Sequence, residues 1–274
     1  QQLLDLAVKH KIRAVSYGRG PDKKTIGRLR DAGIVCMRTV GALKHAQKAI
    51  EMGANVITIQ GGEGGGHTGS VPTTVLLPQV VDNVQVPVIA AGGFYDGRGL
   101  LAALAFGAQG IAMGTRFLMT SDSKTPAVTL ERYLKAKDAE KIQVSHLIDG
   151  MPQRMIPNEY MAMLEKSSSF KRLMIAIQAA LQWKAQTGMT MGHALGVIAK
   201  AFKEDPSTVA QTVMAANAPI LLQKSMAEGK PAEGVMSAGQ VAALIGKLDS
   251  CEDVIQGIVR QALERKAFIN SLGV

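Results

Sequence analysis

The residue with the clearest chemical potential in this sequence is His67, which lies near the end of the glycine-rich run GGEGGGHTG. Glycines dominate the residues before it, so the backbone there can bring the imidazole close to a substrate. An unperturbed histidine has a pKa of about 6.5 and exchanges a proton near neutral pH. We expect His67 to be a catalytic proton-transfer residue. The remaining histidines lack such a setting and are interpreted as structural: His10, His45, His146 and His193.

Three short apolar runs stop at glycine: VITIQGG, PVIAAGG and GIAMGT. An apolar β-branched run, a glycine-rich turn and an amphipathic segment predict strand, loop and helix in succession. If the strands are parallel, the three loops lie at one edge of the sheet, where glycine lets main-chain N–H groups approach an anion. The sequence therefore predicts a site for a phosphate-bearing cofactor, with His67 beside it.

The elements that position these residues alternate strictly between strand and helix. Strands are predicted at residues 12–17, 34–40, 55–60, 87–91 and 111–117, and helices at residues 21–32, 42–52, 74–82 and 97–106. This alternation favours an α/β fold with a parallel sheet. An open doubly wound sheet fits the number of strands, but its glycine-rich loop would follow the first strand. Glycine loops after the last two strands instead match the phosphate site of a (β/α)8 TIM barrel.

We therefore interpret the last three strands as strands six, seven and eight of a barrel that lacks its first strands in this chain. Beyond residue 117 the sequence predicts a short hairpin around Asp149 and Gly150, and methionine-rich helices that pack on one another. Such a helical insertion is a common form of substrate lid. The predicted division is residues 1–120 for the barrel, 121–235 for a helical insertion or lid domain, and 236–274 for helices that close the barrel.

Composition limits the function classes. The 274 residues are 47% hydrophobic but hold no uninterrupted apolar run of membrane-spanning length. The net charge of +9 is spread among acidic residues and only 4% of residues are aromatic, so we expect no nucleic-acid partner. With Cys36 and Cys251 as the two cysteines, the sequence predicts neither a disulfide framework nor a cysteine zinc site, and a cytoplasmic location.

The run ITIQGGEGGGHTG, followed by LLPQVVDNVQVPVIAAGGFYDGRG, GIAMGTRFLMT and SAGQ, resembles the nitronate monooxygenase family, also called 2-nitropropane dioxygenases. It is also similar to FMN-dependent enoyl reductases. The resemblance covers residues 12–120 well and the C-terminal region more loosely. It implies a TIM barrel that holds FMN. The segments RYLKAKD, DGMPQRM and AANAPILL are similar to members associated with steroid-ring and acyl-CoA catabolism.

The resemblance also implies roles for individual residues. Gln60 and Gly61 would meet the flavin ring and its ribityl chain, and His67 would be the base or the group that polarises the substrate. Two loops would hold the phosphate, and their residues are Gly92 and Gly93, and Gly114 and Thr115. The loops supply one phosphate cradle, and no GxGxxG unit leads directly from a predicted strand into a predicted helix as a pyrophosphate site requires, which favours FMN over FAD.

Three functions remain open. The preferred one is oxidation of a small carbanionic nitronate by dioxygen. The second is NAD(P)H-dependent reduction or dehydrogenation of an unsaturated acyl-CoA or a quinone, for which the basic segment around Lys166, Lys171 and Arg172 is suggestive. The third is flavin binding without turnover. The expected partner is a small molecule, with a CoA thioester as one candidate, and the sequence does not specify an oligomeric state.

Overall fold

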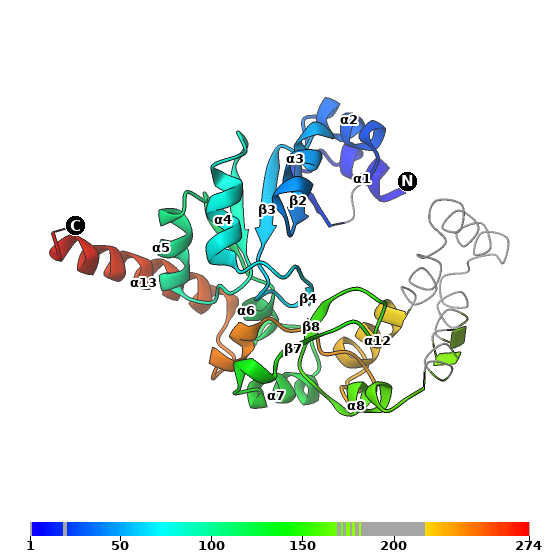
Figure 1. The fold of residues 1–274 in the computed structure, drawn as a ribbon. Helices are drawn as coiled ribbons and strands as arrows, with labels where there is room; N and C mark the ends of the chain where they lie inside the picture. The colour runs from blue at the N-terminus through cyan, green and yellow to red at the C-terminus, as the bar shows by residue number, and fades with distance from the viewer. Residues whose placement is uncertain are drawn as a thin grey trace. The chain divides into compact units, whose positions relative to one another are not determined.

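The structure is a computed structural model that describes residues 2–18, 21–168, 171, 174–175, 177–178, 181 and 217–273. The chain forms two compact units (Figure 1). The first consists of Gln1–Gly64, Thr68–Arg116 and Asp249–Val274, and the second of Gly65–His67 and Phe117–Leu248. His67, together with Gly65 and Gly66, therefore belongs to a different unit from the other glycines of the run GGEGGGHTG.

Within the described residues, the first unit contains a five-stranded parallel sheet in the order β1-β2-β3-β5-β6. Its strands are β1 (Ala14–Tyr17), β2 (Val35–Val40), β3 (Val56–Gln60), β5 (Val88–Ala91) and β6 (Gly110–Ala112). Its helices are α1 (Gln2–Lys9), α2 (Lys23–Asp31), α3 (Leu43–Glu51), α4 (Thr73–Val81), α5 (Gly97–Ala105) and α13 (Cys251–Ser271), and α6 (Thr115–Leu118) starts at its boundary. Strands and helices alternate as predicted, and the described strands lie in chain order without the switch point of a doubly wound sheet, which confirms an α/β fold of the TIM-barrel type.

The helices of this sheet end where local sequence predicts an end. Gly33, Gly53 and Gly107 follow α2, α3 and α5 directly after their C-caps, and their φ angles are 75°, 108° and 89°. A side chain rarely adopts such angles, so glycine terminates each helix and turns the chain toward the next strand. At the other ends, Asp22 and Asp96 cap α2 and α5 by accepting backbone N–H groups. These caps fix where each loop begins.

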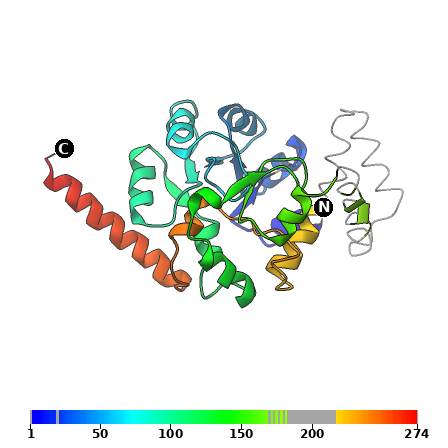
Figure 2. The same cartoon turned by 60° about the horizontal axis from the view of Figure 1, so that its bottom comes forward.

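The main core of the first unit lies between the sheet and α3, α4 and α5. Side chains of β3 such as Ile57 and Ile59 are 0% and 1% exposed and pack against Leu76, Leu77 and Val80 of α4. Burial of a large apolar side chain contributes about 1.5–3 kcal/mol. This packing supports the loops at the C-terminal edge of the sheet, and Figure 2 shows the blue-to-teal helices of the unit lying outside its strands.

One predicted strand is shorter than expected. The strand predicted at residues 111–117 ends at Ala112, and Thr115–Leu118 forms a short helix instead. The apolar pattern IAMGTRFLM does not reveal this change. Arg116 in the short helix is buried, at 6% exposed, and forms an ion pair with the distant Asp249.

Among the described residues of the second unit, the elements are β4 (Gly66–His67), α7 (Ala127–Lys135), η1 (Ala139–Lys141), β7 (Gln143–Ser145), β8 (Gln153–Met155), α8 (Glu159–Glu165), α12 (Asn217–Met226) and η3 (Gln240–Leu244). The predicted hairpin is confirmed, since β7 and β8 pair antiparallel around Gly150, whose φ angle is 79°. The strand β4 adds to the other edge of β8, giving the order β4-β8-β7.

The core of the second unit joins this hairpin to helices. Ile148, Met155, Met161, Leu164 and Leu221 form a buried apolar cluster that links the hairpin to α8 and α12. Several predictions lie outside the described residues. They are the structural role of His193, the basic residue Arg172, and the parts of the predicted methionine-rich helices that fall in most of 170–185, in 192–202 and in 208–216. The role of residues 121–235 as a lid stays a prediction. None of the described helices is both long and apolar enough to cross a membrane.

The helix α13 packs along α5 (Figure 1). The close contact between the two helices requires glycine at position 97. A Cβ on Gly97 would overlap the carbonyl oxygen of Ile258 and lie 2.5 Å from the backbone nitrogen of Ala262. We expect Gly97→Ala to lower the free energy of unfolding by about 1–3 kcal/mol, the usual cost of overpacking. Urea titration followed by circular dichroism measures this change.

Gly257 of α13 is the matched control, because a Cβ there meets nothing within 4 Å. Gly257→Ala should stabilise the protein by about 0.5–1 kcal/mol through helix propensity. A Gly97→Ala protein as stable as the wild type would contradict this account of the α5–α13 contact.

Candidate active site

The six predicted cofactor residues lie at the C-terminal ends of three neighbouring strands. Gln60 ends β3, and Gly61 follows it; the pairs 92–93 and 114–115 follow β5 and β6. The strands β3, β5 and β6 are adjacent and parallel, with Gln60 opposite Ala91 and Ala91 opposite Ala112. The structure thus brings these loops together at one edge of the sheet in the first unit. Their contact with a cofactor remains a prediction.

A side-chain network that sequence patterns did not identify joins two of these loops. The carboxylate of Glu63 accepts the backbone N–H of Thr73, with its two oxygens 3.0 and 3.1 Å from that nitrogen. The Thr73 hydroxyl lies 2.8 Å from the Glu63 carboxylate and 2.9 Å from the carbonyl oxygen of Gly92. Glu63 therefore caps α4, and Thr73 ties the loop after β3 to the loop after β5.

The protein's own packing explains two of the glycines. A Cβ on Gly61 would overlap the Thr73 hydroxyl, and one on Gly92 would lie 2.9 Å from backbone atoms of Gly61. The Gly61 N–H donates to the carbonyl of Ala91 at 3.0 Å. Glycine at these two positions lets the loops approach each other closely, and it is required whether or not a ligand binds.

Gly93 and Gly114 test whether the loops fit a phosphate. Gly93 has a φ angle of 82°, so glycine is required there by backbone conformation. Gly114 has no positive φ, and a Cβ built on it meets no atom within 4 Å. Neither packing nor backbone strain explains glycine at position 114. The open space beside its main chain is what an anion held by backbone N–H groups needs, so the residues present fit a cofactor phosphate.

The turn at Gly114 and Thr115 is anchored by the residue that follows it. The Arg116 guanidinium donates to the Asp249 carboxylate at 3.1 Å, and the Arg116 side chain is 7% exposed. Removing one partner of a buried pair leaves an uncompensated charge. Asp249, just before α13, therefore helps to hold the loop after β6 in place. The sequence of residues 110–120 alone does not show this contact.

His67 in the second unit has a partner that the sequence prediction missed. Its Nε2 lies 2.7 Å from Oδ2 of Asp149, in the turn of the β7–β8 hairpin. The histidine side chain is 52% exposed, whereas the aspartate side chain is 5% exposed. A half-exposed imidazole held by a buried carboxylate is an arrangement suited to proton transfer. The only sequence signal for Asp149 was its place in a predicted turn.

The charge of Asp149 is maintained despite its burial. Burial by itself raises the pKa of the Asp149 carboxyl. Hydrogen bonds from His67, Gln153 and the backbone N–H of Met151 outweigh that effect, so the pKa lies below the usual value for aspartate. The group is therefore a carboxylate at neutral pH, and it can accept a hydrogen bond from the imidazole.

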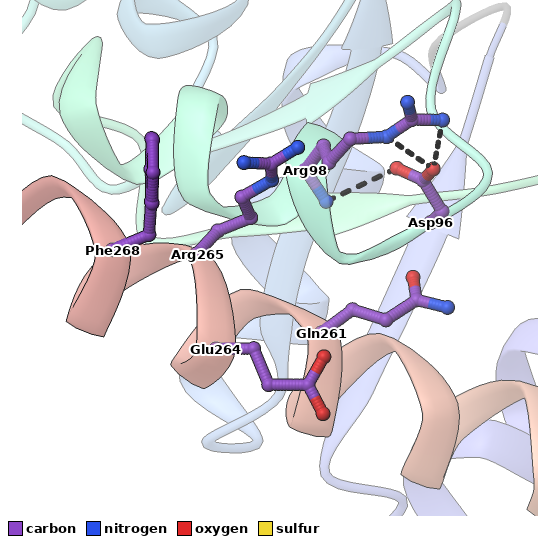
Figure 3. Close-up of a pocket in the computed structure, with 6 residues that line it drawn as sticks. All are labelled: Asp96, Arg98, Gln261, Glu264, Arg265 and Phe268. Atoms are coloured by element: carbon purple, nitrogen blue, oxygen red, sulfur yellow. Dashed lines mark hydrogen bonds and ion pairs between the residues drawn. The ribbon is translucent and has the colours of Figure 1, made fainter.

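A separate cavity of about 460 Å³ lies in the first unit between the start of α5 and α13 (Figure 3). Its lining residues are Asp96, Arg98, Gln261, Glu264, Arg265 and Phe268. The Arg98 guanidinium is paired with Asp96 at 2.6 Å, so its charge is already satisfied within the protein. The cavity contains none of the predicted site residues, and we assign no function to it.

Comparison with known proteins identifies the family of the chain. A family model described as nitronate monooxygenase matches residues 1–261. A Rhodococcus jostii protein named (3aS,4S,5R,7aS)-5-hydroxy-7a-methyl-1-oxo-octahydro-1H-indene-4-carboxyl-CoA dehydrogenase is 44% identical over 272 residues, which are 98% of this chain and 75% of that protein. A Mycobacterium tuberculosis protein of the same name is 42% identical over 265 residues, covering 95% of this chain and 74% of that protein.

A solved structure shows the same fold. The structure of FabK from Thermotoga maritima superposes with a TM-score of 0.74 at 26% identity, over 98% of this chain and 74% of the other. The family model and the two relatives each match nearly the whole chain, which shows the family. The chain belongs to the nitronate monooxygenase family and is an oxidoreductase.

Proposed function

We propose that this protein is a flavin-dependent dehydrogenase of an acyl-CoA thioester, in which His67 takes the proton from the carbon next to the thioester carbonyl. The observation that carries the proposal is the His67–Asp149 pair, with 2.7 Å between Nε2 and Oδ2. A thioester substrate must lose a proton from carbon, so its reaction needs a positioned base. A nitronate arrives already ionised and has less need of one.

The cofactor in this proposal is FMN, held by the loops of the first unit. Backbone N–H groups near Gly93 and Gly114, with the Thr115 hydroxyl, would bind its phosphate, and Gln60 and Gly61 would face the ring and ribityl chain. When bound, the flavin supplies a two-electron acceptor for the hydrogen that leaves with its electron pair. The protein's contribution is to hold the phosphate, orient the substrate and take the proton.

The names of the relatives support the thioester assignment. Both of the relatives described above are named dehydrogenases of a carboxyl-CoA, and each is matched over about three quarters of its length. We propose that residues 121–235 form a lid that excludes water from the reacting carbon and gives room to the CoA tail. NAD(P)H would act as the reductant when the reaction runs toward reduction.

Nitronate oxidation is the second candidate, because the family model that matches residues 1–261 carries that description. In this alternative His67 only assists proton movement, and the size of the effect of its removal separates the two candidates. A protein that binds flavin without turnover is the third.

Anaerobic flavin reduction distinguishes these candidates. The purified protein would be mixed separately with a bicyclic carboxyl-CoA thioester, the corresponding free acid, a nitronate, NADH and NADPH, while the flavin absorbance is followed. We expect rapid bleaching by the thioester and none by the free acid. Mass spectrometry of the released chromophore should give FMN.

Other outcomes each have a meaning. Bleaching by the nitronate alone would replace the proposed function with nitronate oxidation. Retention of flavin that none of the five compounds reduces would favour the non-catalytic alternative. Recovery of FAD would reject the assignment of a single phosphate site.

A further inference from the structure

We propose that Asp149 is a positioning residue that fixes the tautomer of His67, with the proton on Nε2 and the lone pair on Nδ1. This inference rests on the proposed function only for its kinetic consequence, because the tautomer itself is a property of the protein without substrate. Asp149 does not touch the substrate in this proposal. It acts through the imidazole.

The strand pairing shows how the two residues meet. In the β4–β8 ladder His67 is opposite Gln153, and Gly66 is opposite Arg154. Asp149 lies four residues before Gln153, in the turn that joins β7 to β8. The two-residue strand β4 is short, yet it places one ring nitrogen directly against the carboxylate. The hairpin thus delivers the charged group to the ring.

The two carboxylate oxygens of Asp149 have separate partners. Oδ1 accepts the backbone N–H of Met151 at 3.1 Å, and Oδ2 faces Nε2 of His67 at 2.7 Å. The turn itself is closed by a hydrogen bond from the Gly150 N–H to the His146 carbonyl at 3.0 Å. With one oxygen fixed to the backbone, the other is held toward the ring. A carboxylate accepts and does not donate, so Nε2 must carry a proton.

Gln153 reinforces this arrangement. It is 3% exposed, and its side chain donates a hydrogen bond to the Asp149 carboxylate. Its Nε2 lies 3.3 Å from Nε2 of His67. Because the ring nitrogen donates to Asp149, it cannot also accept from the amide, and we read this contact as packing. The buried Gln153 amide therefore hydrogen-bonds to the Asp149 carboxylate and does not donate to the His67 ring.

A purely structural ion pair is the main alternative. Partly exposed ion pairs contribute little to stability, and burying a carboxylate is unfavourable unless its hydrogen bonds are complete. Here the acid is buried while the histidine is half exposed. A pair with one buried and one half-exposed partner adds little to stability. It does hold the imidazole so that the side of the ring opposite Asp149 is directed away from the carboxylate. A buried, hydrogen-bonded carboxylate that faces a half-exposed histidine is an arrangement found at active sites.

Nitrogen NMR tests the tautomer directly. In protein labelled with ¹⁵N-histidine, two-bond ¹H–¹⁵N correlations at alkaline pH distinguish the Nε2–H and Nδ1–H forms of a neutral ring, and His67→Ala identifies the signal. We expect the wild type to show Nε2–H. Asp149→Asn should shift it toward Nδ1–H, because an amide can donate to Nε2. The wild-type spectrum alone can overturn the proposal, if it shows Nδ1–H.

Kinetics supply the second readout. Asp149→Asn should lower kcat by between about 10- and 10⁴-fold, the range seen when partners of functional histidines are changed, with KM and flavin content retained. In a His67→Ala background the same substitution should change kcat little, because residues that act as a unit are not additive. An equal loss in both backgrounds would assign Asp149 a structural role and overturn the proposal.

The matched control is Asp138→Asn, an exposed carboxylate of the same unit that caps η1 by accepting the Glu140 N–H at 3.0 Å. It should leave both the His67 tautomer and kcat unchanged, and a comparable shift in this variant would also overturn the proposal. If the protein proves inactive toward thioesters, the proposed function fails while the NMR result still decides the role of Asp149.

Discussion

Replacing His67 with alanine is expected to lower thioester turnover by roughly 10²- to 10⁴-fold, the contribution that a positioned proton-transfer group commonly makes. The side chain is 52% exposed, so its removal opens no large cavity. The predicted phosphate loops belong to the first unit and rely on backbone groups, so flavin content should remain close to wild type. Stopped-flow reduction of the flavin, with flavin content measured by absorbance, gives both quantities.

His67→Gln is a useful companion variant because its amide can still donate to Asp149 but cannot act as a base. It should lose turnover to the same extent while keeping the buried carboxylate partnered. His146→Ala removes an exposed histidine of the same hairpin and should have no effect. Oxidation of a nitronate should suffer less than thioester turnover in the His67 variants. Wild-type rates with every substrate would remove His67 from the mechanism.

Gly114→Val is expected to abolish flavin retention while the fold is kept. A Cβ at this position meets no protein atom within 4 Å, and the branches of valine beyond it would extend into the space proposed for the phosphate. Each charge-assisted hydrogen bond lost should weaken binding about 10- to 10²-fold. Fluorescence titration of FMN into the apoprotein measures the dissociation constant, and urea unfolding verifies the fold.

Gly110→Val is the matched control, since Gly110 begins β6, the strand that precedes Gly114, and a Cβ on Gly110 also meets nothing within 4 Å. It should retain flavin. Gly93→Val is expected to lose flavin as well, but its φ of 82° means that backbone strain contributes to any loss. If Gly114→Val and Gly110→Val bind FMN equally well, the phosphate lies elsewhere.

The fold was predictable where its signals are local. Helix ends at Gly33, Gly53 and Gly107 follow from residues within one turn, and the alternation of strands with helices follows from apolar periodicity. The prediction was wrong after Ala112, where Thr115–Leu118 forms a helix instead of extending β6. Arg116 in this helix is paired with Asp249, 133 residues later, a contact that a local pattern does not show.

The candidate site shows the same limit. Glycine patterns predicted which loops converge, because strand order and parallel register place them together. They did not predict that Glu63 and Thr73 tie two loops, or that Asp149 pairs with His67 across 82 residues of sequence. A single sequence carries no distance information between such residues. An aspartate before glycine in a turn has the same local appearance whether it caps a loop or orients a histidine.

The discontinuous second unit has a consequence for biosynthesis. His67 leaves the ribosome 82 residues before Asp149, which corresponds to roughly 4–16 s at about 5–20 residues per second. During that interval the nascent chain can form β1, β2 and β3, but β4 has no strand to join, because β8 is not yet made. The His67–Asp149 pair is therefore assembled late, when Asp149 and β8 reach the three-residue segment Gly65–His67 that was synthesised long before.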